Sequence, residues 1–79
     1  MFQILYFNGG VRKTKEIQDF HKACEEAVVL DLEGHLVSSV NKINREGKVI
    51  KNVWELRDDE NTKEAFKRLR ALAETSKAN

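Results

Sequence analysis

The turn Asn8-Gly9-Gly10 constrains the fold of this chain more than any other feature of its sequence. It follows an apolar run over residues 2–7 and precedes a second extended run over residues 11–17. Asn-Gly supplies the positive φ angles that a tight hairpin turn requires. The sequence therefore predicts a β-hairpin at the start of the chain.

A helix is predicted after this hairpin. Asp19 is a suitable N-cap residue, and Gly34 can adopt the left-handed conformation that often ends a helix. Between them, small and apolar side chains recur at three- and four-residue steps, which places them on one helical face. These side chains are Phe20, Ala23, Cys24, Ala27 and Leu30.

The same order of elements then repeats. Residues 36–43 and 48–56 are rich in β-branched side chains and flank the turn at 44–47, which predicts a second hairpin. Asp58, Asp59 and Glu60 place negative charge at the predicted start of a last helix, as the helix dipole prefers. Its buried stripe is predicted to be Ala65, Phe66, Leu69, Leu72 and Ala73. Residues 75–79 are predicted to be a frayed tail.

The predicted fold is a single α+β domain over residues 1–79 in the order ββαββα. Seventy-nine residues leave room for one hydrophobic core and no second domain. Each helix has one apolar stripe to bury, which favours a four-stranded, mainly antiparallel sheet with both helices packed on one face. A core of this size gives modest stability, so self-association is one way to add to it.

The amino-acid composition limits the cellular compartment and the kinds of partner that we expect for this chain. Hydrophobic residues make up 41% of the chain and charged residues 34%, which is a globular balance, and the net charge is +1. Cys24 is the only cysteine, so an intramolecular disulfide is excluded and a reducing compartment, the cytoplasm, is expected. The apolar start lacks a basic segment and stops after seven residues, so we expect a strand there and neither a signal peptide nor a membrane span.

Few residues suggest reaction chemistry. His21 and Cys24 lie three residues apart on the first predicted helix, a spacing that suits a base and a nucleophile, but no third orienting group stands at a diagnostic spacing. A single free cysteine is more often a small core residue. With His35 added, the set still matches no zinc pattern. We therefore expect no catalytic residue, no metal, no cofactor and no enzymatic activity.

Alternation in the first strand predicts an apolar surface. Phe2, Ile4 and Tyr6 point to one side of the sheet while Leu5 and Phe7 point to the other, and two helices on one face cannot cover both sets. An uncovered apolar face would suit a homodimer or another protein partner. The alternative is that a strand curls and both faces are partly buried. The predicted protein-interaction surface is Leu5, Phe7, Ile50, Trp54 and Leu56.

A second predicted surface is basic. If the two hairpins are neighbours, their cations merge into one patch that follows a phosphate backbone, with Tyr6 or Trp54 stacking on bases. The alternative is that these side chains only solubilise the sheet and protect its edges. The patch comprises Arg12, Lys13, Lys15, Lys42, Arg45, Lys48 and Lys51.

The preferred functional hypothesis is an interaction module that binds a protein, as an inhibitor or regulator does. The runner-up is a nucleic-acid-binding protein that uses the basic residues of the hairpins. The compact chain without a catalytic motif, with its Asn-Gly and Glu-Gly turns, is similar in general appearance to many small bacterial and bacteriophage proteins. That resemblance covers no motif and implies no particular activity.

Overall fold

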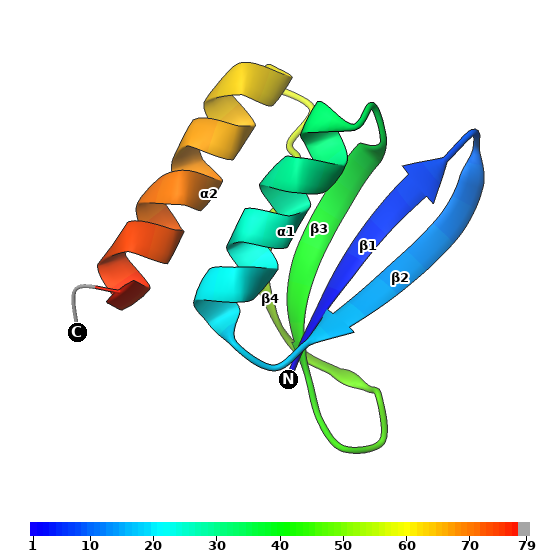
Figure 1. Ribbon diagram of the computed structural model, residues 1–79, viewed down its shortest axis with the longest axis vertical. Helices are drawn as coiled ribbons and strands as arrows, with labels where there is room; N and C mark the ends of the chain where they lie inside the picture. Colours follow the sequence, from blue (N-terminus) through cyan, green and yellow to red (C-terminus); the bar gives the residue numbers. More distant parts are fainter. Residues whose placement is uncertain (78–79) are drawn as a thin grey trace.

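The computed structural model describes residues 1–77 and shows the predicted ββαββα order (Figure 1). Both hairpins and both helices form within a few residues of their predicted bounds. The elements are β1 (Phe2–Asn8), β2 (Val11–Ile17), α1 (Phe20–Leu32), β3 (Leu36–Ile43), β4 (Val49–Glu55) and α2 (Thr62–Lys77). The α+β class is therefore confirmed.

The four strands form one antiparallel sheet in the order β2-β1-β3-β4. The two hairpins are neighbours, as the basic patch required, because β1 pairs with β3 at the centre of the sheet. This pairing is antiparallel, with Phe7 opposite Leu36 and Phe2 opposite Lys42. The turns of the two hairpins therefore lie at opposite ends of the sheet, as Figure 1 shows.

Both helices lie on the same side of the sheet, and α2 packs beside α1 (Figure 1). The predicted stripes face inward: all but two of their members are buried, and these two, Phe20 and Leu72, pack at the margin. The side chains that the sheet contributes to this core come from β1, β3 and β4. They are Ile4, Val37, Val40 and Trp54.

The predicted ends of α1 are confirmed. The Asp19 carboxylate accepts hydrogen bonds from the backbone N–H groups of His21 at 2.8 Å and Lys22 at 3.4 Å, which satisfies donors that have no partner inside the helix. At the other end Gly34 has φ 93°, and the next residue, His35, donates its N–H to the carbonyl of Leu30. A glycine fits there because side chains disfavour positive φ.

The start of α2 differs from the prediction. The helix begins at Thr62, and the side chain of Asn61 accepts the N–H of Glu64 at 2.8 Å, so Asn61 caps it. Asp58 and Asp59 lie in the preceding turn, not in the first helical turn. The side-chain amide of Asn61 caps the helix directly, so the helix begins after the acidic run and not within it. The helix reaches Lys77, so residues 75–77 of the predicted tail are helical, and residues 78–79 of that tail lie outside the described residues.

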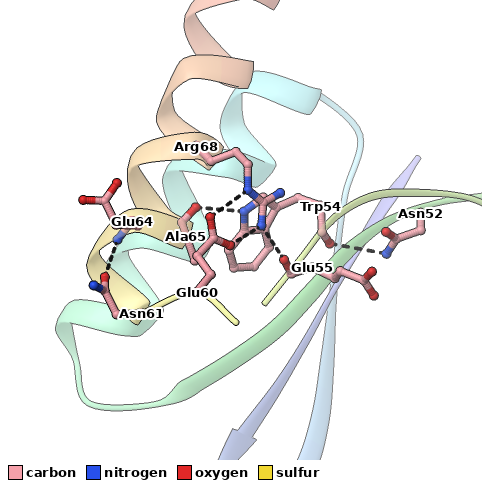
Figure 2. Close-up of polar contacts among 8 residues, drawn as sticks. All are labelled: Asn52, Trp54, Glu55, Glu60, Asn61, Glu64, Ala65 and Arg68. Carbon is pink, nitrogen blue, oxygen red and sulfur yellow. Dashed lines mark hydrogen bonds and ion pairs between the residues drawn. The ribbon is translucent and has the colours of Figure 1, made fainter. Parts of the chain in front are cut away.

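A cluster around Trp54 attaches α2 to β4 (Figure 2). The indole N–H donates to the carbonyl of Ala65 at 2.9 Å, and the ring packs against Phe66 with 5.2 Å between centroids. Arg68 lies over the indole at 5.8 Å and donates to both carboxylate oxygens of Glu60, at 2.7 and 3.2 Å. The helix is held on the edge strand of the sheet by ring packing, by the indole hydrogen bond and by the bidentate ion pair.

Two register shifts disturb β4. Trp54 pairs with Val40 and Asn52 with Asn41, so Val53 is an extra residue on this strand. A similar shift leaves Ile50 unpaired between Lys51 and Val49. Each β-bulge reverses the alternation of side chains between the two faces. Trp54 and Asn52 therefore point to opposite faces although they are two residues apart.

Candidate functional site

The sheet face opposite the helices carries the first candidate surface, which we call the open face. Directly paired residues on antiparallel strands share a face, so each neighbour of a core residue such as Ile4 or Val40 points away from the helices. By this register the open face comprises Gln3, Leu5, Phe7, Arg12, Thr14, Glu16, Leu36, Ser39, Asn41, Ile43, Val49, Asn52 and Glu55.

One end of the open face is apolar. Phe7 and Leu5 are half-buried, and Leu36, directly opposite Phe7, is 55% exposed. The placement of Leu5 and Phe7 agrees with the alternation in the sequence. Around them the open face bears one cation, Arg12, and two carboxylates on the edge strands, so it has almost no net charge.

The centre of the open face is a chain of polar side chains. Asn52 donates to the side-chain oxygen of Asn41 at 2.8 Å, and Asn41 donates to the hydroxyl of Ser39 at 3.1 Å. Asn52 also donates to the carbonyl of Trp54 at 3.3 Å. Ser39 and Asn41 are each only 8% exposed although no helix covers them. Their mutual hydrogen bonds offset the cost of burying these groups.

Three of the five residues predicted for the protein-interaction surface do not belong to the open face. Trp54 is 1% exposed and lies under α2. The bulge at Val53 turns its side chain to the helix side of the sheet. Leu56 follows β4 and packs against the same core. Ile50 is 57% exposed, but it is the bulged residue near the tip of the β3–β4 hairpin, away from Leu5 and Phe7.

The seven predicted basic residues do not form one patch. Arg12, Lys13 and Lys15 lie on β2, and by register Arg12 points to the open face while the other two point to the helix side. Lys15 forms an ion pair with Glu26 of α1 at 2.6 Å, and this hydrogen bond raises the pKa of Lys15. The remaining four cations lie at the other end of the sheet.

These four cations define the second candidate surface, the basic hairpin, which spans residues 42–51. Lys42 and Lys51 are a direct cross-strand pair, and Arg45 and Lys48 belong to the connecting loop. All four are exposed. Among the residues that the structure describes, none of the four forms an ion pair. The two aromatic side chains that were predicted to stack on bases do not lie beside these cations. Trp54 is buried, and Tyr6 packs on His35 with 5.7 Å between ring centroids.

The arrangement around Cys24 does not favour nucleophilic chemistry. Cys24 is 2% exposed, and burial raises the pKa of its thiol to about 11, so the reactive thiolate is scarce at neutral pH. The interpretation of Cys24 as a core residue is confirmed. His21 directs Nε2 to the carboxylate of Glu25 at 2.7 Å, not to the sulfur, and its buried Nδ1 has no hydrogen-bond partner within the described part of the chain.

A groove of about 420 Å³ lies between the two helices beside these residues. Its lining mixes small or apolar side chains with charges of both signs. The lining residues are His21, Cys24, Glu25, Val28, Val29, Arg70, Ala73 and Glu74. Across the described side chains, no group of three His, Cys, Asp or Glu residues could hold a metal ion.

Some features of these surfaces were not predicted from the sequence. The hydrogen-bonded row Ser39, Asn41 and Asn52 was missed, although Ser39 and Asn41 flank the core residue Val40, and this polar–apolar alternation was the available signal. In the part of the chain that the structure covers, neither helix has the length and apolar character needed to span a bilayer. Comparisons with protein-family models, curated proteins and solved structures found no match to this chain.

Proposed function

We propose that this protein is a non-enzymatic interaction module whose open face binds a partner protein. The observation that carries the proposal is the presence of Phe7, Leu5 and Leu36 on a sheet face that neither helix covers. Partly exposed apolar side chains on such a face remain available for burial by another molecule. A regulator or inhibitor that blocks a site on its target is the class of protein that this arrangement fits best.

The chemistry of the open face favours a protein over a nucleic acid as its partner. An apolar cluster beside hydrogen-bonding side chains is typical of protein interfaces, whose centres are poor in charged residues. A phosphate backbone requires an excess of cations, whereas the open face has one cation against two carboxylates. A standard interface needs about 800 Å² from each partner. That is a small part of the 5472 Å² that this protein exposes.

A second copy of the chain is one partner that fits this description. In a face-to-face pair with a two-fold axis parallel to the strands, β1 of one copy would face β3 of the other. Phe7 would then meet Leu36, and Gln3 would meet Asn41, because these residues are level in the sheet. Such a contact is self-complementary, as a two-fold interface must be.

The test compares two Leu→Glu substitutions. Leu36→Glu places a charge on the open face, while Leu32→Glu makes the same change on α1, where the leucine is 75% exposed. A photo-crosslinking residue at Thr14, which also lies on the open face, captures the partner in an extract of the source cells, and mass spectrometry identifies it. Light scattering of the purified protein detects self-association directly.

We expect Leu36→Glu to weaken binding of the captured protein at least tenfold in a titration with purified components, and Leu32→Glu to leave it unchanged. If the partner is a second copy, the wild-type mass is that of a dimer and only Leu36→Glu gives a monomer. Equal binding by both variants, or a wild-type monomer with no partner crosslinked at Thr14, would contradict the proposal.

A further inference from the structure

Charge is strongly segregated in this small protein. Residues 42–51 contain four cations and one carboxylate, a formal charge of +3, while the whole chain has a net charge of +1. The rest of the chain is therefore net negative. The low overall charge, which argues against DNA binding when taken alone, conceals one concentrated positive surface at the basic hairpin.

The cations of the basic hairpin repel one another. Lys42 and Lys51 lie directly opposite each other on neighbouring strands, and like charges in this position destabilise a sheet. Two cations elsewhere in the chain have carboxylate partners: Lys15 pairs with Glu26, and Arg68 pairs with Glu60. Within the described residues the basic hairpin has no such compensation, so an anionic partner would relieve its repulsion.

The loop that carries two of these cations is rigidly built. The side-chain oxygen of Asn44 accepts the N–H groups of Glu46 and Lys48, both at 3.0 Å. The backbone N–H of Asn44 donates to the carbonyl of Lys48, and Gly47 closes the turn with φ 81°. Arg45 and Lys48 are thus attached to an ordered backbone, and less conformational entropy is lost when they bind a ligand.

We propose that the basic hairpin binds double-stranded DNA by entering its major groove. The major groove of B-DNA is wide enough for a two-stranded β-ribbon, and the end of the β3–β4 hairpin extends below the rest of the sheet in Figure 1. Lys42, Lys51 and Lys48, with Arg45 at the tip, neutralise phosphates. The exposed side chains of Val49 and Ile50 offer apolar contacts of the kind that thymine methyl groups accept.

The shape of the basic hairpin distinguishes DNA from other anions. The major groove of A-form RNA is too deep and narrow for protein side chains to read, so the same ribbon fits duplex RNA poorly. Single strands are held by stacking on aromatic side chains, and the basic hairpin has none. This proposal does not depend on the apolar cluster of the open face, Leu5, Phe7 and Leu36, which lies at the opposite end of β3.

The test measures binding of the full chain to a fluorescent DNA duplex between 50 and 200 mM salt. Each neutralised phosphate contributes a slope of about −0.9 to the dependence of log K on log salt, so four contacts give roughly −3 to −4, or about a 100-fold loss of affinity over this range. Lys48→Ala with Lys51→Ala should reduce the slope by about 2. The matched control, Lys63→Ala with Lys67→Ala on α2, removes two exposed lysines outside both candidate surfaces and should leave the slope unchanged.

Circular dichroism and thermal unfolding of both double variants establish that they are folded. Parallel titrations use an RNA duplex, single-stranded DNA and vesicles with 30% anionic lipid. Binding to the DNA duplex that exceeds binding to each of these probes at least tenfold, and that weakens only in the hairpin variant, supports the proposal. No duplex binding at 50 mM salt, equal losses in the two variants, or preference for vesicles or RNA would overturn it.

Discussion

The two faces of the sheet are built from the same strands but are stabilised in different ways. On the helix side, Ile4 and Val40 are fully buried in an apolar core with Trp54. On the open face, the next residues along these strands are the half-buried Leu5 and the hydrogen-bonded Asn41. Van der Waals packing and the hydrophobic effect stabilise the first face, and side-chain hydrogen bonds order the second.

This difference separates stability from binding. The core residues on the helix side are covered, so they contribute to folding and offer no surface to a partner. The open face has a hydrogen-bonded polar centre and no helix above it, so Phe7 and Leu36 stay partly exposed for the partner proposed above. Substitutions that compare the faces should therefore affect the free energy of unfolding very unequally.

The largest expected effect is that of Trp54→Ala. Removing a buried aromatic ring from a core costs about 3–5 kcal/mol. Here the substitution also removes the hydrogen bond to Ala65 and the surface on which Arg68 rests. Urea unfolding followed by circular dichroism measures the change. A loss below about 1 kcal/mol would mean that α2 does not depend on this side chain, and the two faces would no longer differ as described.

The sharpest comparison uses neighbours in β1. Ile4→Ala removes a side chain with 0% exposure and should destabilise the protein by about 2–5 kcal/mol. Leu5→Ala removes a half-buried side chain and should cost only about 1 kcal/mol, in proportion to the smaller area it hides. Both variants are measured in the same urea titration. Similar losses would show that the open face is packed as tightly as the core.

The smallest effect is the pH dependence due to Glu60. The hydrogen bonds from Arg68 lower the pKa of Glu60 below its ordinary value of 4.5, so the folded state holds this carboxylate charged more strongly than the unfolded state does. The stabilisation is therefore present above pH 4.5 and is lost as the pH falls below it. We expect Glu60→Gln to destabilise the protein at pH 7 and to reduce the loss of stability between pH 7 and pH 3.

The control for this prediction is Glu64→Gln, which changes an exposed carboxylate in the first turn of the same helix. Thermal unfolding at several pH values compares the two variants with the wild type. If Glu64→Gln and Glu60→Gln alter the acid limb of the stability curve equally, the bidentate pair with Arg68 has no special role.

Local signals predicted the fold well because they act over a few residues. The first hairpin turn, the Asp19 cap and the spacing of Ala23, Ala27 and Leu30 each specify one element without reference to the rest of the chain. The positive φ angles of that turn fall on Gly9 and Gly10, not on Asn8 as the Asn-Gly pattern predicted, because Asn8 is the last residue of β1. The predicted start of α2 was wrong because two signals for a helix start lie close together there. The helix begins after the Asn61 cap and not at the acidic residues before it. The candidate surfaces were predicted less well, since a surface is assembled from several strands.

The sequence by itself determined the order of the elements, the face of each helix that is buried and the position of Leu5 and Phe7 opposite Ile4. Only the tertiary structure decided that Trp54 lies beneath α2, because the bulge at Val53 reverses the alternation of side chains, and a bulge depends on how a strand pairs with its neighbour. The tertiary structure also decided that the basic residues of the two hairpins lie apart. The pairing of β1 with β3 sends the two hairpin turns to opposite ends of the sheet and leaves one positive surface, the basic hairpin, at one of them.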